Sequence, residues 1–85
     1  MAVYRNYETE GSVFEGDREY PVIIYHREWW NWEIEVFRNP LTGEWEGDAI
    51  AYGEFFDIDE DTPIMYYGQL MSIPEVLKKL DEESE

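Results

Sequence analysis

Acidic residues recur at every second position along much of this 85-residue chain. Five such runs hold 13 of its 21 Asp and Glu residues: Glu8/Glu10, Glu15/Asp17/Glu19, Glu33/Glu35, Glu44/Glu46/Asp48 and Asp57/Asp59/Asp61. Side chains two residues apart lie on the same face of a β-strand, about 7 Å from each other. The spacing therefore predicts a chain made mainly of half-exposed strands that carry rows of carboxylates on their solvent side.

The apolar residues predict what lies beneath these rows. Trp32, Ile34 and Val36 alternate with Glu33 and Glu35, so one face of this strand is expected to be buried. Aromatic residues make up 18% of the sequence, and large rings supply much buried area in a small domain. This composition favours a folded domain over a disordered acidic chain.

Strands and turns can be placed from β-branched, aromatic, Gly and Pro residues. The expected strands are Val3–Tyr7, ended by Gly11, then Ser12–Glu15, Pro21–Trp30, Trp32–Arg38, Glu44–Asp57 and Ile64–Tyr67. Turns are expected at Gly16–Asp17 and Asn39–Gly43, and an acidic loop at Asp57–Pro63. Pro21 is expected to open its strand, and Gly47 and Gly53 to mark bulges or close backbone approach.

One helix is expected near the C-terminus. Ser72 and Glu75 have the spacing of a capping box, and Val76, Leu77 and Leu80 then fall on one helical face. The predicted fold class is α+β: an antiparallel β-sheet of about four to six strands with one C-terminal α-helix packed on one face. A single domain is expected over residues 1–80, followed by a frayed acidic tail over residues 81–85.

Several kinds of function fit the composition poorly. The chain has no cysteine, which excludes disulfides, thiol catalysis and Cys-based metal sites. Its one histidine, His26, is interpreted as a structural or surface residue, and neither an enzyme nor a cofactor is expected. The formal charge of −15 disfavours direct binding to nucleic acid or to anionic membranes. With no signal peptide or apolar membrane span, a cytoplasmic protein is expected.

A metal site at Asp57, Asp59 and Asp61 is the less favoured alternative to a solvated acidic loop. An EF-hand loop that began at Asp57 would need Gly at its sixth position and Glu at its twelfth. Thr62 and Gly68 occupy those positions, so the sequence does not predict a dedicated calcium site.

Trp29 and Trp30 are adjacent in an expected strand, so they should point to opposite faces of the sheet. At least one of the two rings is therefore expected outside the core. Such a ring could cover the open face, anchor a protein partner or stack on a sugar.

The sign of the charge is the most informative functional feature. From Asn39 to Leu77 there are nine acidic residues and no Lys or Arg, whereas ordinary solvent faces mix both signs. Net charge this far from zero destabilises the folded state through self-repulsion. The simplest use for it is to bind a strongly basic protein surface, although a halophilic source could also select it for solubility.

The leading hypothesis is a nucleic-acid mimic that occupies the basic groove of a nucleic-acid-binding protein. In size, acidity and absence of catalytic groups, the chain resembles small phage-encoded inhibitors, including anti-CRISPR proteins, and other DNA mimics. This resemblance is one of physical character and involves no family motif. The expected partner-binding residues are Glu33, Glu35, Glu44, Glu46, Asp48, Glu54, Asp57, Asp59, Asp61, Trp29 and Trp30.

Two alternatives stay open. The first is a non-catalytic accessory or adaptor domain that binds an ordinary basic protein through an aromatic-centred interface. The second is a carbohydrate-binding module that uses exposed Trp side chains. The sequence does not indicate the oligomeric state.

Overall fold

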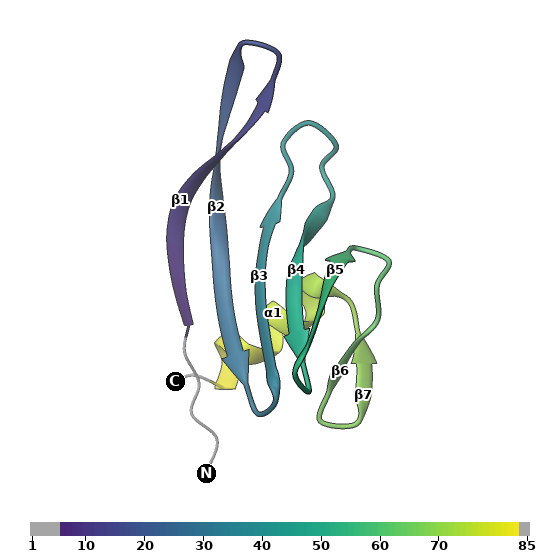
Figure 1. The fold of residues 1–85 in the computed structure, drawn as a ribbon. Coiled ribbons are helices and arrows are strands. Elements are labelled where there is room, and N and C mark those ends of the chain that lie inside the picture. Colours follow the sequence, from purple (N-terminus) through teal and green to yellow (C-terminus); the bar gives the residue numbers. More distant parts are fainter. Residues whose placement is uncertain (1–5, 84–85) are drawn as a thin grey trace.

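The computed structural model describes residues 6–83 and confirms the α+β fold (Figure 1). Five strands form an antiparallel sheet in sequential order, followed by a short two-stranded sheet and one C-terminal helix. The elements are β1 (Asn6–Glu15), β2 (Arg18–Trp29), β3 (Trp32–Arg38), β4 (Trp45–Ala51), β5 (Glu54–Asp59), β6 (Ile64–Tyr66), β7 (Gln69–Met71) and α1 (Ile73–Glu83).

Helix α1 covers one face of the five-stranded sheet (Figure 1). The alternating residues of β3 explain this arrangement, because Ile34 and Val36 are fully buried against the helix side. Ile73, Val76 and Leu80 supply the helical part of the same core. Within residues 6–83 no helix or strand covers the opposite face of the sheet, which we call the open face (Figure 1).

One arginine lies on the covered face and joins three elements. Arg27, on β2, is only 4% exposed. Its guanidinium donates hydrogen bonds to the carbonyl oxygens of Tyr7 and His26 and to Asp81 on α1. It also lies 3.6 Å from a carboxylate oxygen of Glu8. These contacts satisfy most of a charge that would otherwise be costly to bury.

The first hairpin is longer than the sequence predicts. Val3–Tyr7 and Ser12–Glu15 were expected as separate strands, but β1 continues through Gly11, where an added Cβ would touch the Ile24 side chain. The part of the first prediction before Asn6 lies outside the described residues. Pro21 does not open β2, which starts at Arg18. Because β3 pairs with β2 only from Ile24 onward, Pro21 sits where one side of β2 has no neighbour in the sheet.

The predicted long strand from Glu44 to Asp57 is wrong. It is two strands, β4 and β5, joined by a turn at Tyr52–Gly53, and Gly53 supplies the positive φ of 82° that such a turn uses. Gly47 does mark a close backbone approach, since a Cβ there would lie 2.7 Å from the Val36 Cα. The acidic loop begins only after Asp59, because β5 extends to that residue.

The remaining differences concern the C-terminal part. Strand β7 was not predicted, since its three residues are too few to show a period. Helix α1 begins after Ser72, as expected, but continues to Glu83 through residues that were assigned to a frayed tail. Asp81 pairs with Arg27, and Glu83 accepts a hydrogen bond from the Tyr66 hydroxyl, so tertiary contacts hold this last turn. Residues 84 and 85 lie outside the described part.

Candidate functional site

The open face of the sheet gathers most of the predicted acidic site residues. Register and alternation put two of them on each of three adjacent strands: Glu33 and Glu35 on β3, Glu46 and Asp48 on β4, Asp57 and Asp59 on β5. Neighbouring strands lie about 4.8 Å apart, and same-face residues along a strand lie about 7 Å apart. The carboxylates therefore form a two-dimensional grid rather than separate rows.

The centre of this grid is one cross-strand row. Glu35 is opposite Asp48, and Asp48 is opposite Asp57. The pKa of Asp48 is raised by partial loss of hydration, by a hydrogen bond shared with Asp57, and by the negative charges of Asp57 and Glu35. The register places these carboxylates directly opposite one another, and like charges in such positions in a sheet repel.

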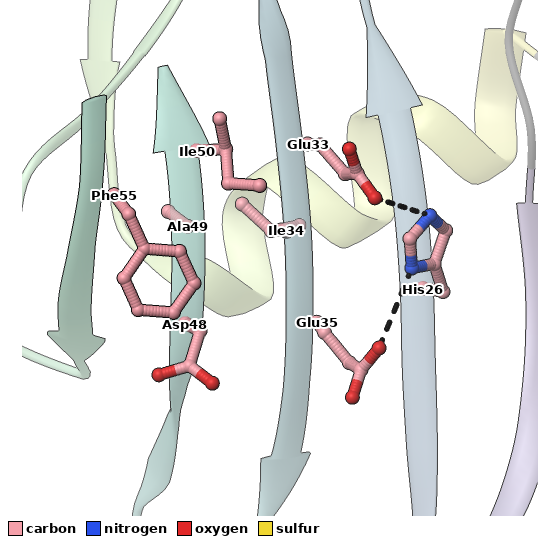
Figure 2. A pocket seen from close by; sticks show the side chains of 8 residues that line it. All are labelled: His26, Glu33, Ile34, Glu35, Asp48, Ala49, Ile50 and Phe55. Carbon is pink, nitrogen blue, oxygen red and sulfur yellow. Dashed lines mark ion pairs between the residues drawn. The ribbon is translucent and has the colours of Figure 1, made fainter. Parts of the chain in front are cut away.

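The same row continues to His26 on β2, which is opposite Glu35. His26 is 7% exposed, and its ring stacks on Tyr7 with centroids 4.4 Å apart. Its Nε2 lies 3.3 Å from Glu33 Oε1 and its Nδ1 lies 3.6 Å from Glu35 Oε2 (Figure 2). The expectation of a structural or surface histidine missed these carboxylates. His26 and Glu28 precede the two-residue Trp30–Asn31 turn with i, i+2 spacing, and Glu33 and Glu35 follow it with the same spacing, so the pairing could have been predicted.

Apolar side chains share the open face with the acids. Ile50 and Phe55 are opposite each other on β4 and β5, and both are exposed. Together with His26, Glu33 and Asp48 they line a shallow hollow on this face (Figure 2). A ligand that lies on the grid would therefore touch hydrophobic surface as well as charge.

Other predicted site residues lie off the open face. Glu44 precedes β4 in the exposed β3–β4 loop, Asp61 lies in the exposed loop after β5, and Glu54 is on the covered-face side at the start of β5. Trp29 was expected to contact a partner, but it is 1% exposed and stacks on Trp32 in the core, so it offers no surface to a partner. Trp30 is 64% exposed, because it lies in the turn and not in a strand.

The Asp57–Asp61 segment is not arranged around a shared point. Asp59 Oδ1 instead accepts hydrogen bonds from the Asp61 N–H and the Thr62 hydroxyl, which stabilises the loop itself. In the described part of the chain, the group of three side chains close enough to hold one metal ion is His26, Glu28 and Glu33.

A second exposed surface, the aromatic end, consists of Trp30, Tyr52 and Tyr67. Each opens a two-residue turn between paired strands, and the three turns lie at the lower end of the molecule in Figure 1. Their φ angles are 40°, 52° and 48°, in the left-handed region that bulky residues rarely adopt. Trp30 and Tyr52 meet edge to face, with ring centroids 6.0 Å apart. Tyr52 and Tyr67 could not be singled out from the sequence, because the two turns that expose them were not predicted.

No helix in residues 6–83 is long and apolar enough to cross a membrane. Comparisons with protein-family models, with curated proteins and with solved structures gave no match.

Proposed function

We propose that this protein binds the basic surface of a nucleic-acid-binding protein through its open face and acts as a nucleic-acid mimic. The observation that carries the proposal is the crowded row Glu35–Asp48–Asp57, in which the pKa of Asp48 is raised. Carboxylates held this close destabilise the free protein and become favourable when Lys or Arg side chains lie between them.

The geometry of the grid supports a polyanionic mimic. Duplex DNA presents one charge per ~1.7 Å of helix axis, and proteins that bind it carry clusters of Lys and Arg. The spacing of ~7 Å along each strand corresponds to about two base-pair steps on one DNA strand. Because the charges stand on a packed sheet, the partner does not have to order them on binding. Ile50 and Phe55 add a contact that salt does not screen.

The test is capture of partners from a lysate of the source cells, with and without nuclease, followed by mass spectrometry. We expect recovery of a nucleic-acid-binding protein in both samples. The partner should then be titrated with two triple variants that carry the same charge change. Glu35→Gln/Asp48→Asn/Asp57→Asn removes the central row, and Glu10→Gln/Glu15→Gln/Glu82→Gln neutralises acids elsewhere.

Comparison of the two triple variants distinguishes binding through the open face from nonspecific attraction to an acidic protein. Each exposed ion pair contributes under ~1 kcal/mol, so single changes should weaken binding by less than about fivefold. The central-row triple should weaken it by roughly 30-fold or more, and the control triple by much less. Equal losses would mean that net charge alone drives association.

The aromatic end favours a second candidate, an adaptor that binds an ordinary basic protein. Trp and Tyr are enriched at the centres of protein interfaces, and three strained, exposed rings gathered at one end are costly to keep without a use. In this case Trp30→Ala would weaken binding more than the central-row triple. Binding of wild-type protein on a glycan array, lost in Trp30→Ala, would instead support a carbohydrate-binding module.

A further inference from the structure

Four ionisable side chains form a compact block where β2 meets β3. His26 and Glu28 lie on the open face of β2, and Glu33 and Glu35 lie opposite them on β3. The register pairs Glu28 directly with Glu33, and His26 directly with Glu35. Two carboxylates directly opposite each other repel, so this block is a place where a cation is attracted. The two-residue turn beside this block fixes both strands, so the four groups cannot easily separate.

The imidazole is the most unusual member of the block. It is more than nine-tenths buried, and its Nδ1 has no hydrogen-bond partner although Glu35 Oε2 lies 3.6 Å away. Buried polar atoms are nearly always hydrogen-bonded, so an unsatisfied one points to a missing ligand or to a geometry that tightens on binding. Stacking on Tyr7 holds the ring in place with its Nε2 edge toward Glu33.

We propose that His26, Glu28 and Glu33 bind a divalent transition-metal ion of the Zn²⁺ class. One ligand atom from each residue lies within 4.8 Å of the other two, which small side-chain rotations can bring into one coordination sphere. The 3.3 Å between His26 Nε2 and Glu33 Oε1 already matches the separation of about 3.3 Å between two ligands of a tetrahedral zinc ion.

Glu35 completes the site as a positioning residue. Metal-bound histidines commonly donate their other ring N–H to a carboxylate, which fixes the tautomer and strengthens the ligand. Glu35 lies where it can accept from Nδ1–H once Nε2 holds the metal. The buried Nδ1 would then have Glu35 as its hydrogen-bond acceptor, while Nε2 holds the ion.

The donor set predicts the class of metal. An imidazole nitrogen favours Zn²⁺ and similar ions, whereas Mg²⁺ and Ca²⁺ prefer oxygen ligands alone. Bound there, the ion would link β2 to β3 and reduce the negative charge at one corner of the open face. Binding of the ion by the isolated protein does not depend on the proposed partner.

The experiment is calorimetric titration of metal-stripped protein with ZnCl₂, CaCl₂ and MgCl₂ in 0.15 M NaCl. We expect one Zn²⁺ per chain, bound at least tenfold more tightly than Ca²⁺ or Mg²⁺. Glu33→Gln should weaken Zn²⁺ binding at least tenfold, and Glu35→Gln by about tenfold. The matched control is Asp61→Asn, which makes the same charge change in the other acidic cluster and should have no such effect.

A second measurement follows the histidine directly in the wild-type protein. Long-range ¹H–¹⁵N NMR spectra should show the Nε2 resonance of His26 shift on addition of one equivalent of Zn²⁺, with Nδ1 retaining its proton. The proposal fails if the ring resonances do not respond. It also fails if Zn²⁺ binds no better than Mg²⁺, or if Glu33→Gln and Asp61→Asn weaken binding equally, since diffuse attraction to an acidic surface would then explain the result.

Discussion

Asp48→Asn should stabilise the folded protein at neutral pH. Asp48 lies between Glu35 and Asp57 at cross-strand positions, where side chains are about 5 Å apart. Two unit charges at this distance in water repel by about 0.8 kcal/mol, so two neighbours give roughly 1.6 kcal/mol. Solvent exposure and salt reduce this by about half or more, which leaves ~0.5–1 kcal/mol. In a domain of this size, the melting temperature should rise by about 3–6 °C.

The raised pKa of Asp48 determines how the stabilising effect of Asp48→Asn should change with pH. Because the folded-state pKa of Asp48 lies above its ordinary value of 3.8, the folded protein binds this proton more tightly than the unfolded chain. The group's ionisation therefore lowers stability as pH rises from 3.8 through the raised pKa, and this loss is complete at neutral pH. The advantage of Asp48→Asn should accordingly be largest near pH 7 and vanish near pH 3.5.

Thermal unfolding followed by circular dichroism at several pH values is a sufficient assay. Glu10→Gln is the matched control, because it removes the same charge from β1 at a position opposite the uncharged Ile23. An Asp48→Asn protein no more stable than this control at pH 7, or one whose advantage persists unchanged at pH 3.5, would refute the argument that the row is crowded.

Three further predictions concern stability. Gly47→Ala should lower the free energy of unfolding, measured in urea titrations, by about 2 kcal/mol or more, because the alanine Cβ would lie 2.7 Å from the Val36 Cα. A decrease of less than about 0.5 kcal/mol would contradict the close approach of β3 and β4. Tyr52→Asn should raise the free energy of unfolding by about 1 kcal/mol, since Asn suits the left-handed turn position that Tyr52 occupies at φ 52°; destabilisation would mean that the ring's contact with Trp30 outweighs the strain. The melting temperature of the wild-type protein should rise as NaCl increases from low concentration to about 0.5 M, where the Debye length is roughly 4 Å; a temperature unaffected by salt would contradict self-repulsion on the open face.

The sequence predicts the sheet well where alternation is strong. Trp32–Arg38 matches β3 at both ends, because charged and apolar residues alternate strictly over its first five positions. Prediction from the sequence fails where a turn contains aromatic residues, as at Tyr52–Gly53. Tyr is typical of strands, so the segment was expected to continue as a strand. For the same reason, the sequence did not predict that the rings of the aromatic end lie in turns.

The acidic face could be predicted in composition but not in arrangement. Period two places Glu33 and Glu35, or Asp57 and Asp59, on common faces, and the structure agrees. Which residues lie opposite one another depends on register, which the turn lengths set and the sequence alone left open. The burial of His26 and its contacts with Glu33 and Glu35 depend on that register, so the sequence could name the histidine but not its surroundings.

A nucleic-acid mimic must occupy a surface where its partner binds nucleic acid, so the two ligands should compete for the partner. The most direct test measures the dissociation constant between this protein and its captured partner at increasing concentrations of duplex DNA, or of RNA if the partner binds RNA. Mutually exclusive binding predicts that the apparent dissociation constant rises in proportion to nucleic-acid concentration once the partner is saturated. An unchanged constant, with both ligands bound to the partner at once, would contradict mimicry of nucleic acid by the open face.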